Sequence, residues 1–235
     1  MKTLVIIPAY NEEANILDTL RDLRENGGNP DVLVVNDCST DRTAALLREN
    51  GVPFLDLPVN LGIGGGVQSG YRYALERGYD TAVQFDGDGQ HMATCLPALL
   101  APIREGRADY TVGSRFLERE GFQSSALRRL GIRFLSGLIR ALCGVRVLDA
   151  TSGMRAVNRD LIALFAADYP QDYPEPEAIL AAGLRGFRVE EVPVRMRERQ
   201  GGVSSINPLR SVYYMIKVSL ALAMARAAFR KEDAK

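Results

Sequence analysis

Cysteine is scarce in this sequence. Among 235 residues only Cys38, Cys95 and Cys143 are cysteines, an odd number with wide spacing and no CxxC pair. A disulfide framework needs paired cysteines, and a zinc site needs closely spaced ones. We therefore expect three reduced thiols in a cytosolic protein, without disulfides or a zinc centre.

Long hydrophobic runs are also missing. The N-terminal run TLVIIP reaches Pro8 after only a few apolar residues, too short for a signal peptide, and it reads better as a first buried strand. The most apolar segment, residues 212–229, has the minimum length for a bilayer span, but Lys217 and Arg226 interrupt it. We expect a helix that packs on the protein, forms an oligomer contact or docks on a membrane partner.

An excess of charge is absent overall, because 29 Lys and Arg balance 29 Asp and Glu. The distribution is uneven: residues 185–235 hold 11 basic and 5 acidic side chains, and residues 115–146 hold 7 Arg and 2 Glu. Such basic segments indicate an anionic partner, for which phosphate, nucleic acid and an acidic membrane surface are the candidates.

Residues 124–143 combine basic and apolar side chains at helical spacing. The segment predicts a basic amphipathic helix, which either packs on the core with solvated arginines or lies on a membrane surface. Its apolar positions are Leu127, Leu130, Phe134, Leu138 and Leu142, and its polar positions are Arg129, Arg133, Ser136 and Arg140.

The first half of the chain alternates short β-branched runs with helical patterns. This alternation predicts βαβ units and a mostly parallel sheet with helices on both faces. The predicted strands are 3–8, 31–36, 53–58, 81–85 and 109–114, and the predicted helices lie near 12–26, 40–50, 65–77 and 94–105.

The predicted strands end in polar or glycine-rich loops. Four of these loops read PAYNEE, NDCSTD, NLGIGGG and DGDGQH. Ligands of parallel sheets bind beyond the carboxyl ends of the strands. We therefore expect these loops to converge on a binding site.

The loop DGDGQH places Asp86 and Asp88 one residue apart. It fails as a calcium-binding EF-hand, because the ligand, glycine and glutamate positions of that motif hold Gln90, His91 and Ala98. A phosphatase nucleophile normally follows the first strand, whereas this pair follows the fourth. Two carboxylates that alternate along an extended backbone do fit a hard divalent cation whose other ligands are phosphate and water.

Two neighbouring signals are weaker. The run NLGIGGGVQSG does not match GxGxxG, because Val67 stands at the sixth position, although a glycine-rich helix start can bind a phosphate. His91 is the single histidine, and we interpret it as a residue that supports a metal site more than as a catalytic base.

Taken in order, these segments resemble the family 2 inverting glycosyltransferases, and most of all their dolichol-phosphate mannosyltransferase and bacterial polyprenyl-phosphate glycosyltransferase branch. The resemblance covers roughly residues 1–207. The segments that carry it are VIIPAYNEE, VVNDCSTDRT, NLGIGGGVQSG, QFDGDGQH, VGSRF, TSGMRAVNR and GFRVEEVPVRMRERQGGVSS.

The resemblance implies a fold and a set of site residues. The fold would be a nucleotide-sugar-binding Rossmann-like α/β domain of the GT-A type over residues 1–207, with a C-terminal helical extension over residues 208–235 for oligomer or membrane-partner docking. Asp86, Asp88 and Gln90 would bind Mg²⁺ or Mn²⁺ and through it the donor diphosphate. Nucleotide-sugar contacts would come from Pro8, Ala9, Tyr10, Glu12, Asp37, Gly62, Ser114 and Ser204, and phosphate contacts from Arg115 and Arg199.

The expected function is transfer of a sugar from a UDP- or GDP-linked donor to polyprenyl phosphate or a lipid-linked glycan. A lipid phosphate is already ionised and needs no general base. A saccharide hydroxyl, as in cell-wall or surface polysaccharide synthesis, needs a carboxylate, for which Glu175 and Glu177 are candidates. A third hypothesis is a non-catalytic nucleotide-sugar-binding subunit.

We also expect the protein to be cytoplasmic and peripheral at the membrane. A small membrane partner protein and a homo-oligomer are the candidate assemblies, and the basic helix and the C-terminal helix would serve the docking. No nucleic-acid partner is expected.

Overall fold

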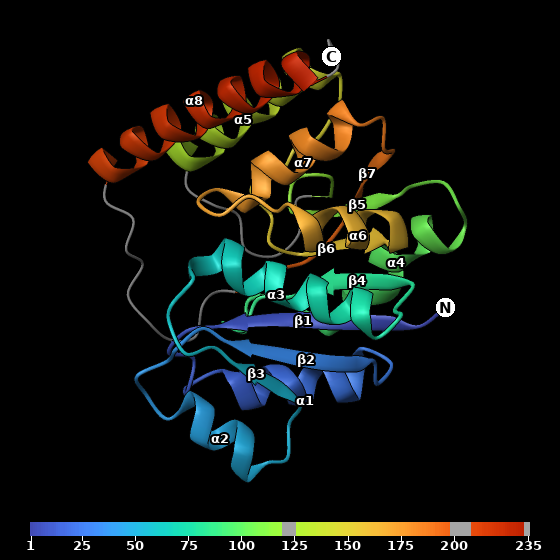
Figure 1. Ribbon diagram of the computed structural model, residues 1–235, viewed down its shortest axis with the longest axis vertical. Helices are drawn as coiled ribbons and strands as arrows, with labels where there is room; N and C mark the ends of the chain where they lie inside the picture. The colour runs from blue at the N-terminus through green and yellow to red at the C-terminus, as the bar shows by residue number, and fades with distance from the viewer. Residues whose placement is uncertain (119–125, 198–207, 233–235) are drawn as a thin grey trace.

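The computed structural model describes residues 1–118, 126–197 and 208–232, and its described part contains one seven-stranded sheet flanked by helices (Figure 1). The strands are β1 (Thr3–Ala9), β2 (Asp31–Asn36), β3 (Phe54–Asp56), β4 (Thr81–Gln84), β5 (Tyr110–Ser114), β6 (Arg155–Asn158) and β7 (Val189–Pro193). The helices are α1 (Ile16–Asn26), α2 (Thr43–Glu49), α3 (Gly62–Glu76), α4 (Leu96–Arg104), α5 (Ala126–Cys143), α6 (Arg159–Ala167), α7 (Pro174–Leu184) and α8 (Pro208–Glu232), with a 3₁₀ turn (Ala93–Cys95) before α4.

The sheet has the order β3-β2-β1-β4-β6-β5-β7. Strands β3, β2, β1 and β4 are parallel, and β5 pairs in parallel with β7. Strand β6 lies between the two groups and is antiparallel to β4 and to β5. The predicted mostly parallel α/β sheet is thus confirmed, and β6 and β7 add two strands that the alternation in the first half did not reveal.

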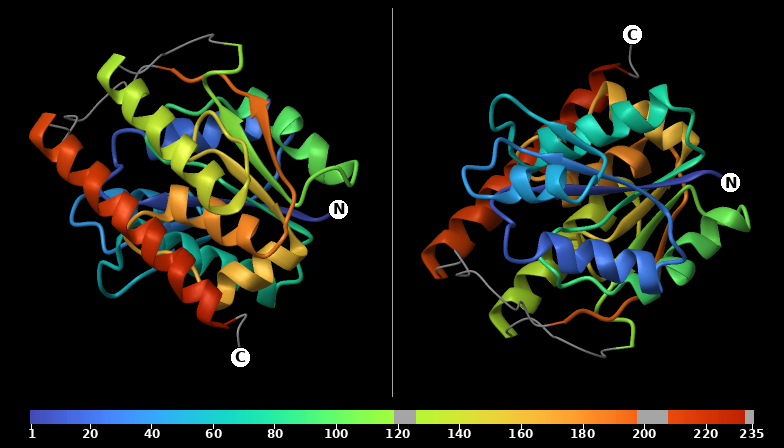
Figure 2. Two further views of the ribbon diagram at one scale, coloured as in Figure 1. Left: turned by 90° about the horizontal axis from the view of Figure 1, so that it is seen from above. Right: turned by 90° about the horizontal axis from the view of Figure 1, so that it is seen from below.

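Alternate residues of β1 face two separate apolar layers. Leu4 and Ile6 of β1 point into one cluster of buried side chains, while Val5 and Ile7 point into the other. This follows from the two-residue period of a strand, and a strand buried on both faces needs apolar residues at successive positions. Helices α3, α5, α6 and α7 lie on the first side, where α8 packs on α5 and α7, and α1, α2 and α4 lie on the second (Figure 2).

Helices α5 and α8 lie side by side at the end of the molecule opposite β3 and α2 (Figures 1 and 2). Val218 and Leu222 of α8 are completely buried and belong to the same apolar cluster as Leu135 and Ile139 of α5. The C-terminal segment therefore packs on the protein, which is one of the three alternatives expected from the sequence. Within the described residues, no helix is both long and apolar enough to cross a bilayer.

Candidate active site

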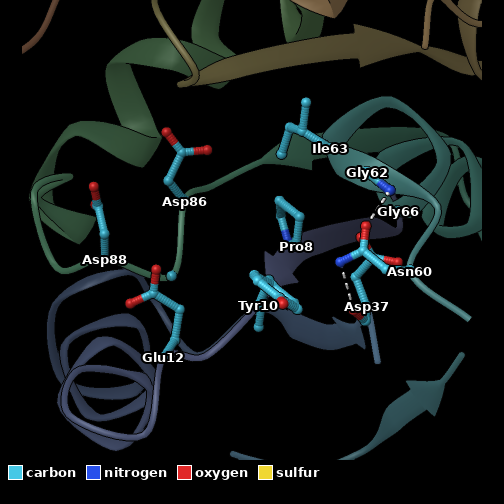
Figure 3. Close-up of a pocket in the computed structure, with 12 residues that line it drawn as sticks. Pro8, Tyr10, Glu12, Asp37, Asn60, Gly62, Ile63, Gly66, Asp86 and Asp88 are labelled. Atoms are coloured by element: carbon cyan, nitrogen blue, oxygen red, sulfur yellow. Dashed lines mark hydrogen bonds between the residues drawn. The ribbon is translucent and has the colours of Figure 1, made fainter. Parts of the chain in front are cut away.

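A pocket of about 430 Å³ opens where β1, β2 and β4 end and α3 begins (Figure 3). Its position beyond the carboxyl ends of parallel strands is the expected one for this class of sheet. The lining residues are Pro8, Ala9, Tyr10, Glu12, Asp37, Asn60, Gly62, Ile63, Gly66, Asp86, Gly87 and Asp88. The four loops named from the sequence thus contribute to one cavity.

One end of the pocket is acidic. Figure 3 shows Glu12, Asp86 and Asp88 on the same side, whereas Asp37 and Asn60 lie at the opposite side beyond Pro8 and Tyr10. A backbone hydrogen bond connects the loops that line the two ends: Asp37 N–H donates to the Ala9 carbonyl at 2.9 Å. One end of the pocket therefore holds three carboxylates. The rest of the pocket offers the Tyr10 ring, the Asn60 amide and the buried Asp37 carboxylate.

The loop after β1 is fixed by the loop after β2. Asn11 has a φ of 56°, and its side-chain oxygen accepts a hydrogen bond from Thr40 N–H at 2.8 Å. The Glu12 N–H donates to Thr43 Oγ1 at 2.9 Å, and Glu12 Oε2 accepts from Asn15 Nδ2 at 3.0 Å. Asparagine tolerates a left-handed backbone because its short polar side chain bonds locally. These bonds hold Tyr10 at the mouth of the pocket, where it is half exposed.

Asp37 joins the end of β2 to the start of α3. Its Oδ1 accepts a hydrogen bond from Leu61 N–H at 2.7 Å, and its carbonyl accepts one from Asn60 Nδ2 at 3.1 Å. The side-chain oxygen of Asn60 in turn accepts from Gly62 N–H at 3.1 Å. Asn60 therefore shapes the start of α3 beside the pocket, a contribution that we did not predict although asparagine before a helix is a common starting signal.

The glycines that open α3 serve two purposes. A Cβ on Gly64 would lie 2.3 Å from the Pro170 carbonyl oxygen, and one on Gly65 would lie 2.4 Å from Leu61 Cβ, so these positions are needed for close packing. Gly62, with a φ of 74°, and Gly66 line the pocket. Bare backbone at this point lets a bound molecule approach the helix start closely.

Asp86 and Asp88 both face the pocket from the loop after β4, but their surroundings differ. Asp86 Oδ2 lies 3.0 Å from His91 Nε2, and Asp88 Oδ1 accepts a hydrogen bond from Gln90 N–H at 3.0 Å. Burial alone would raise the pKa of the Asp86 carboxyl, yet attraction to His91 and the hydrogen bond with His91 hold that pKa below its usual value. Asp86 is therefore an anion at neutral pH.

This donor set fits a hard divalent cation. No cluster of three or more His, Cys, Asp or Glu side chains with metal-binding geometry occurs among residues 1–118, 126–197 and 208–232. Two carboxylates at the rim of an open pocket are instead what Mg²⁺ uses when substrate phosphates and water supply the remaining ligands. Gln90 does not line the pocket; its side-chain amide lies 3.5 Å from the Arg197 carbonyl, so its role as a ligand stays a prediction.

Ser114 and Arg115 lie outside the pocket lining. The guanidinium of Arg115 donates through Nε and Nη2 to the two carboxylate oxygens of Asp149, each at 2.6 Å, and both side chains are buried. Ser114 is also buried, with Oγ accepting from Phe116 N–H at 3.4 Å. In the structure Arg115 therefore forms a buried ion pair with Asp149. The contact of Arg115 with a phosphate stays a prediction.

The two candidate carboxylates on α7 separate in space. Glu177 lines a second pocket, between α6, α7 and α8, with Asp168 and Arg185. Glu175 instead lies near Arg155 and Asp86, and burial raises its pKa although Arg155 opposes this effect. Of the two, Glu175 is closer to the acidic end of the first pocket. Glu177 as a base stays a prediction.

Arg199 and Ser204 lie outside the described residues, but the described segment 126–197 ends close to the acidic loop. The Arg197 N–H donates to the Gln90 carbonyl at 2.8 Å, and Met196 forms a β-bridge with His91. Arg197 also forms an ion pair with Asp22 of α1 at 3.4 Å. Residue 197 is thus anchored beside the two aspartates, only two positions before Arg199.

The buried Arg155 is a residue that the sequence analysis missed. Its guanidinium donates to Tyr110 Oη at 2.5 Å and to the carbonyls of Ser152 at 2.5 Å, Glu175 at 2.7 Å and Ala150 at 3.2 Å. It therefore connects β5, the turn before β6 and the start of α7 directly behind Asp86. An arginine within a four-residue strand has no periodic signal that would distinguish it from a surface residue.

The sequence of this chain is similar to those of known proteins. Residues 4–165 match the sequence profile described as Glycosyl transferase family 2. The chain is 32% identical over 216 residues to the undecaprenyl-phosphate mannosyltransferase of Micrococcus luteus, covering 88% of each chain. It is also 32% identical over 228 residues to the polyprenol monophosphomannose synthase of Mycolicibacterium smegmatis, covering 93% of this chain and 86% of that one.

A solved structure supports the fold. Glucosyl-3-phosphoglycerate synthase from Mycobacterium tuberculosis, crystallised with Mn²⁺, UDP-glucose and phosphoglyceric acid, superposes with a TM-score of 0.73 at 20% identity. The match covers 97% of this chain and 80% of that one. The resemblance seen in the sequence segments is thereby confirmed: the chain belongs to glycosyl transferase family 2 and has the GT-A type of fold.

Proposed function

We propose that this protein is a metal-dependent inverting glycosyltransferase that moves a sugar from a UDP- or GDP-linked donor to polyprenyl phosphate. The observation that carries the proposal is the convergence of Asp86 and Asp88 on the pocket that Pro8, Tyr10 and Asp37 line. A nucleoside would lie at the Asp37 end, and the diphosphate would extend toward the two aspartates. The Mn²⁺ and UDP-glucose bound by the related synthase support this assignment.

The chemistry follows from the residue types. Asp86 and Asp88 would hold Mg²⁺ or Mn²⁺, which when bound neutralises the charge that develops on the departing nucleoside diphosphate. Tyr10 and Asp37 orient the nucleoside so that the diphosphate meets the carboxylates. Gly62 and Gly66 allow close approach of the donor to the start of α3. Arg115, Arg199, Ser114 and Ser204 are kept as predicted contacts of donor or acceptor phosphates, with Gln90 as a third metal ligand.

A lipid phosphate is the favoured acceptor. One relative is named an undecaprenyl-phosphate mannosyltransferase and the other a polyprenol monophosphomannose synthase, and both are covered over most of their length. A phosphate acceptor is already ionised and attacks the anomeric carbon without a base. Direct displacement of the nucleoside diphosphate inverts the configuration of that carbon. A saccharide hydroxyl would need a carboxylate base, for which Glu175 and Glu177 are the candidates and Glu175 lies nearer to Asp86.

The proposed place of action is the periphery of the membrane. Exposed apolar side chains on α5 and α8, together with arginines on α5, support docking on a lipid surface, a small membrane partner or a second copy of the chain. Residues 208–235 would act as the docking extension of a catalytic domain spanning residues 1–207.

The substitution Asp88→Ala tests the site. We expect it to lower metal-dependent sugar transfer by a factor of about 100 or more, because a charge-stabilising group at the departing diphosphate is lost. Radiolabelled UDP- and GDP-sugars with polyprenyl phosphate and Mn²⁺ provide the assay, and Asp18→Ala on the exposed surface of α1 is the control. Unchanged transfer and donor hydrolysis in Asp88→Ala would show that the site lies elsewhere.

The substitutions Glu175→Gln and Glu177→Gln test the acceptor, with Glu175 nearer to Asp86 and Glu177 in the second pocket. If a lipid phosphate accepts the sugar, both variants keep their turnover, because no proton has to be removed. A saccharide hydroxyl as acceptor predicts a loss of about 100-fold or more in the variant that lacks the base, the usual contribution of a general base. Parallel assays with polyprenyl phosphate and with a saccharide acceptor distinguish the two cases.

A further inference from the structure

The carboxylate of Asp86 lies against two residues, His91 and Gly153, that do not line the pocket. The side chain of Asp86 is 34% exposed, whereas that of His91 is fully buried behind it. His91 Nε2 lies 3.0 Å from Asp86 Oδ2. Since an ionised carboxylate can only accept, Nε2 carries the hydrogen of this bond.

Within the described part of the chain, Asp86 is the one hydrogen-bond partner of the His91 ring. Its Nδ1 is buried and has no hydrogen-bond partner within the described part of the chain, and the ring packs against Phe85 with centroids 5.3 Å apart. A buried nitrogen without a partner is unfavourable, so an apolar side chain would fill the same space at a lower cost. The hydrogen bond to Asp86 explains why a histidine stands here.

Gly153 lies against the same carboxylate. A Cβ at this position would lie 2.2 Å from Asp86 Oδ2 and 2.8 Å from both Cγ and Oδ1. The backbone of Gly153 is not among the positive-φ glycines, so its lack of a side chain is needed for the carboxylate and not for the turn. The segment around it is fixed by Arg155, which binds the carbonyls of Ala150 and Ser152.

We propose that His91 and Gly153 are positioning residues that fix the orientation of the Asp86 carboxylate for the divalent cation. The hydrogen bond occupies Oδ2, and the missing Cβ lets the carboxylate lie flat against residue 153, which leaves Oδ1 for the ion. This proposal rests on the proposed function, in which Asp86 binds the metal. A carboxylate fixed before the metal arrives loses less side-chain entropy on binding.

The experiment measures nucleotide affinity with and without metal, not turnover. Isothermal titration gives the Kd of UDP and GDP in saturating Mn²⁺ and in EDTA for the wild type, His91→Leu, His91→Gln and Gly153→Ala. Glutamine keeps an N–H donor near the place of Nε2, whereas leucine removes it. Gly137→Ala on α5 is the matched control, because an added Cβ there meets open space.

We expect His91→Leu and Gly153→Ala to lose about tenfold or more of the tightening by Mn²⁺, the usual effect of removing a group that orients a metal ligand. The Kd in EDTA should stay unchanged in both, and His91→Gln should recover much of the effect. A merely structural role would weaken binding equally with and without metal, which would overturn the proposal.

The outcomes also separate this proposal from the proposed function. If Mn²⁺ tightens binding equally in the wild type, His91→Leu and Gly153→Ala, the positioning role is wrong while the metal site stands. If Mn²⁺ does not tighten binding in the wild type, the metal site itself is wrong and the positioning role falls with it.

Discussion

At the scale of single residues, arginines with similar sequence surroundings have different roles. Arg115 and Arg155 are both buried and hydrogen-bonded to protein groups, whereas Arg133 and Arg140 are exposed on α5. A buried guanidinium needs a partner for its charge, and Asp149 supplies it for Arg115. The same residue type thus builds the frame behind the pocket and the charged surface outside it.

The ion pair between Arg115 and Asp149 gives a prediction about stability. Removing one partner leaves a buried charge, so Arg115→Met or Asp149→Leu alone should lower the free energy of unfolding by about 3 kcal/mol. The double variant should lose less than the sum of the two single losses, because it leaves no unpaired charge. Urea unfolding followed by circular dichroism measures all three.

Arg21→Met breaks the exposed pair of Arg21 with Asp18 and is the control, expected to change stability by less than about 1 kcal/mol. Strict additivity in the double variant would show that the buried pair is not energetically coupled.

At the scale of elements, one acidic side chain links three strands. Asp109, just before β5, accepts hydrogen bonds from Arg188 N–H at 2.9 Å, Arg188 Nε at 3.0 Å and Arg188 Nη2 at 2.8 Å, just before β7. It also accepts from Asn158 Nδ2 at the end of β6, at 3.1 Å. These hydrogen bonds connect the ends of β5, β6 and β7 through residues that are far apart in the sequence.

This link predicts a pH dependence of stability. The hydrogen bond from Arg188 holds the pKa of Asp109 below its usual value. A lowered folded-state pKa stabilises the fold above the pKa of the unfolded chain, and this contribution disappears as pH falls through the folded-state pKa. Asp109→Asn should therefore lower the free energy of unfolding by about 1 kcal/mol at pH 7, a value reduced for the exposed Arg188.

The difference between wild type and Asp109→Asn should shrink as pH falls below about 4, near the pKa of an unfolded aspartate. Urea unfolding at several pH values checks this, with Glu49→Gln at an exposed ion pair on α2 as the control. A difference that stays constant from pH 7 to the acid range would contradict the assignment.

At the scale of the whole molecule, one end exposes an apolar surface. We call it the apolar face: Leu130 and Phe134 of α5 and Tyr213, Ile216, Leu220 and Met224 of α8 are each more than half exposed. Arg133, Arg140 and Lys217 are exposed on the same two helices. Monomeric proteins seldom expose apolar patches of this kind without a partner, and neighbouring cations suit an anionic lipid surface.

The apolar face predicts binding to lipid vesicles. We expect the wild type to sediment with vesicles that contain phosphatidylglycerol, and less with neutral vesicles or at high salt, because part of the attraction is electrostatic. Replacing Leu130, Phe134, Ile216 and Leu220 by Gln should lower binding by about tenfold or more, since several buried apolar groups are lost from the contact.

Leu75→Gln, which changes one exposed apolar residue of α3 outside the apolar face, is the control for vesicle binding. Light scattering of the wild type in the absence of lipid tests the alternative partner. A dimer that dissociates on the four substitutions, with no vesicle binding, would assign the apolar face to a second copy of the chain.

The sequence alone determined the general architecture and the general position of the pocket. The β-branched runs and the polar loops at strand ends are local patterns, which is why four of the first five strands were predicted to within one residue at each end, while β3 is shorter than the predicted 53–58. The spacing of Asp86 and Asp88 at the end of β4 predicted the acidic end of the pocket for the same reason. Local patterns are sufficient where the physical cause is itself local.

The tertiary structure decided what depends on residues distant in the chain. It placed β6 antiparallel between β4 and β5, joined Arg115 to Asp149, and brought Gly153 against a carboxylate more than sixty positions earlier. It also separated Glu175 from Glu177, although the two share the first turn of α7, because neighbouring positions on a helix turn point in different directions. Such relations arise from packing across the sheet, so no periodic pattern in the sequence reports them.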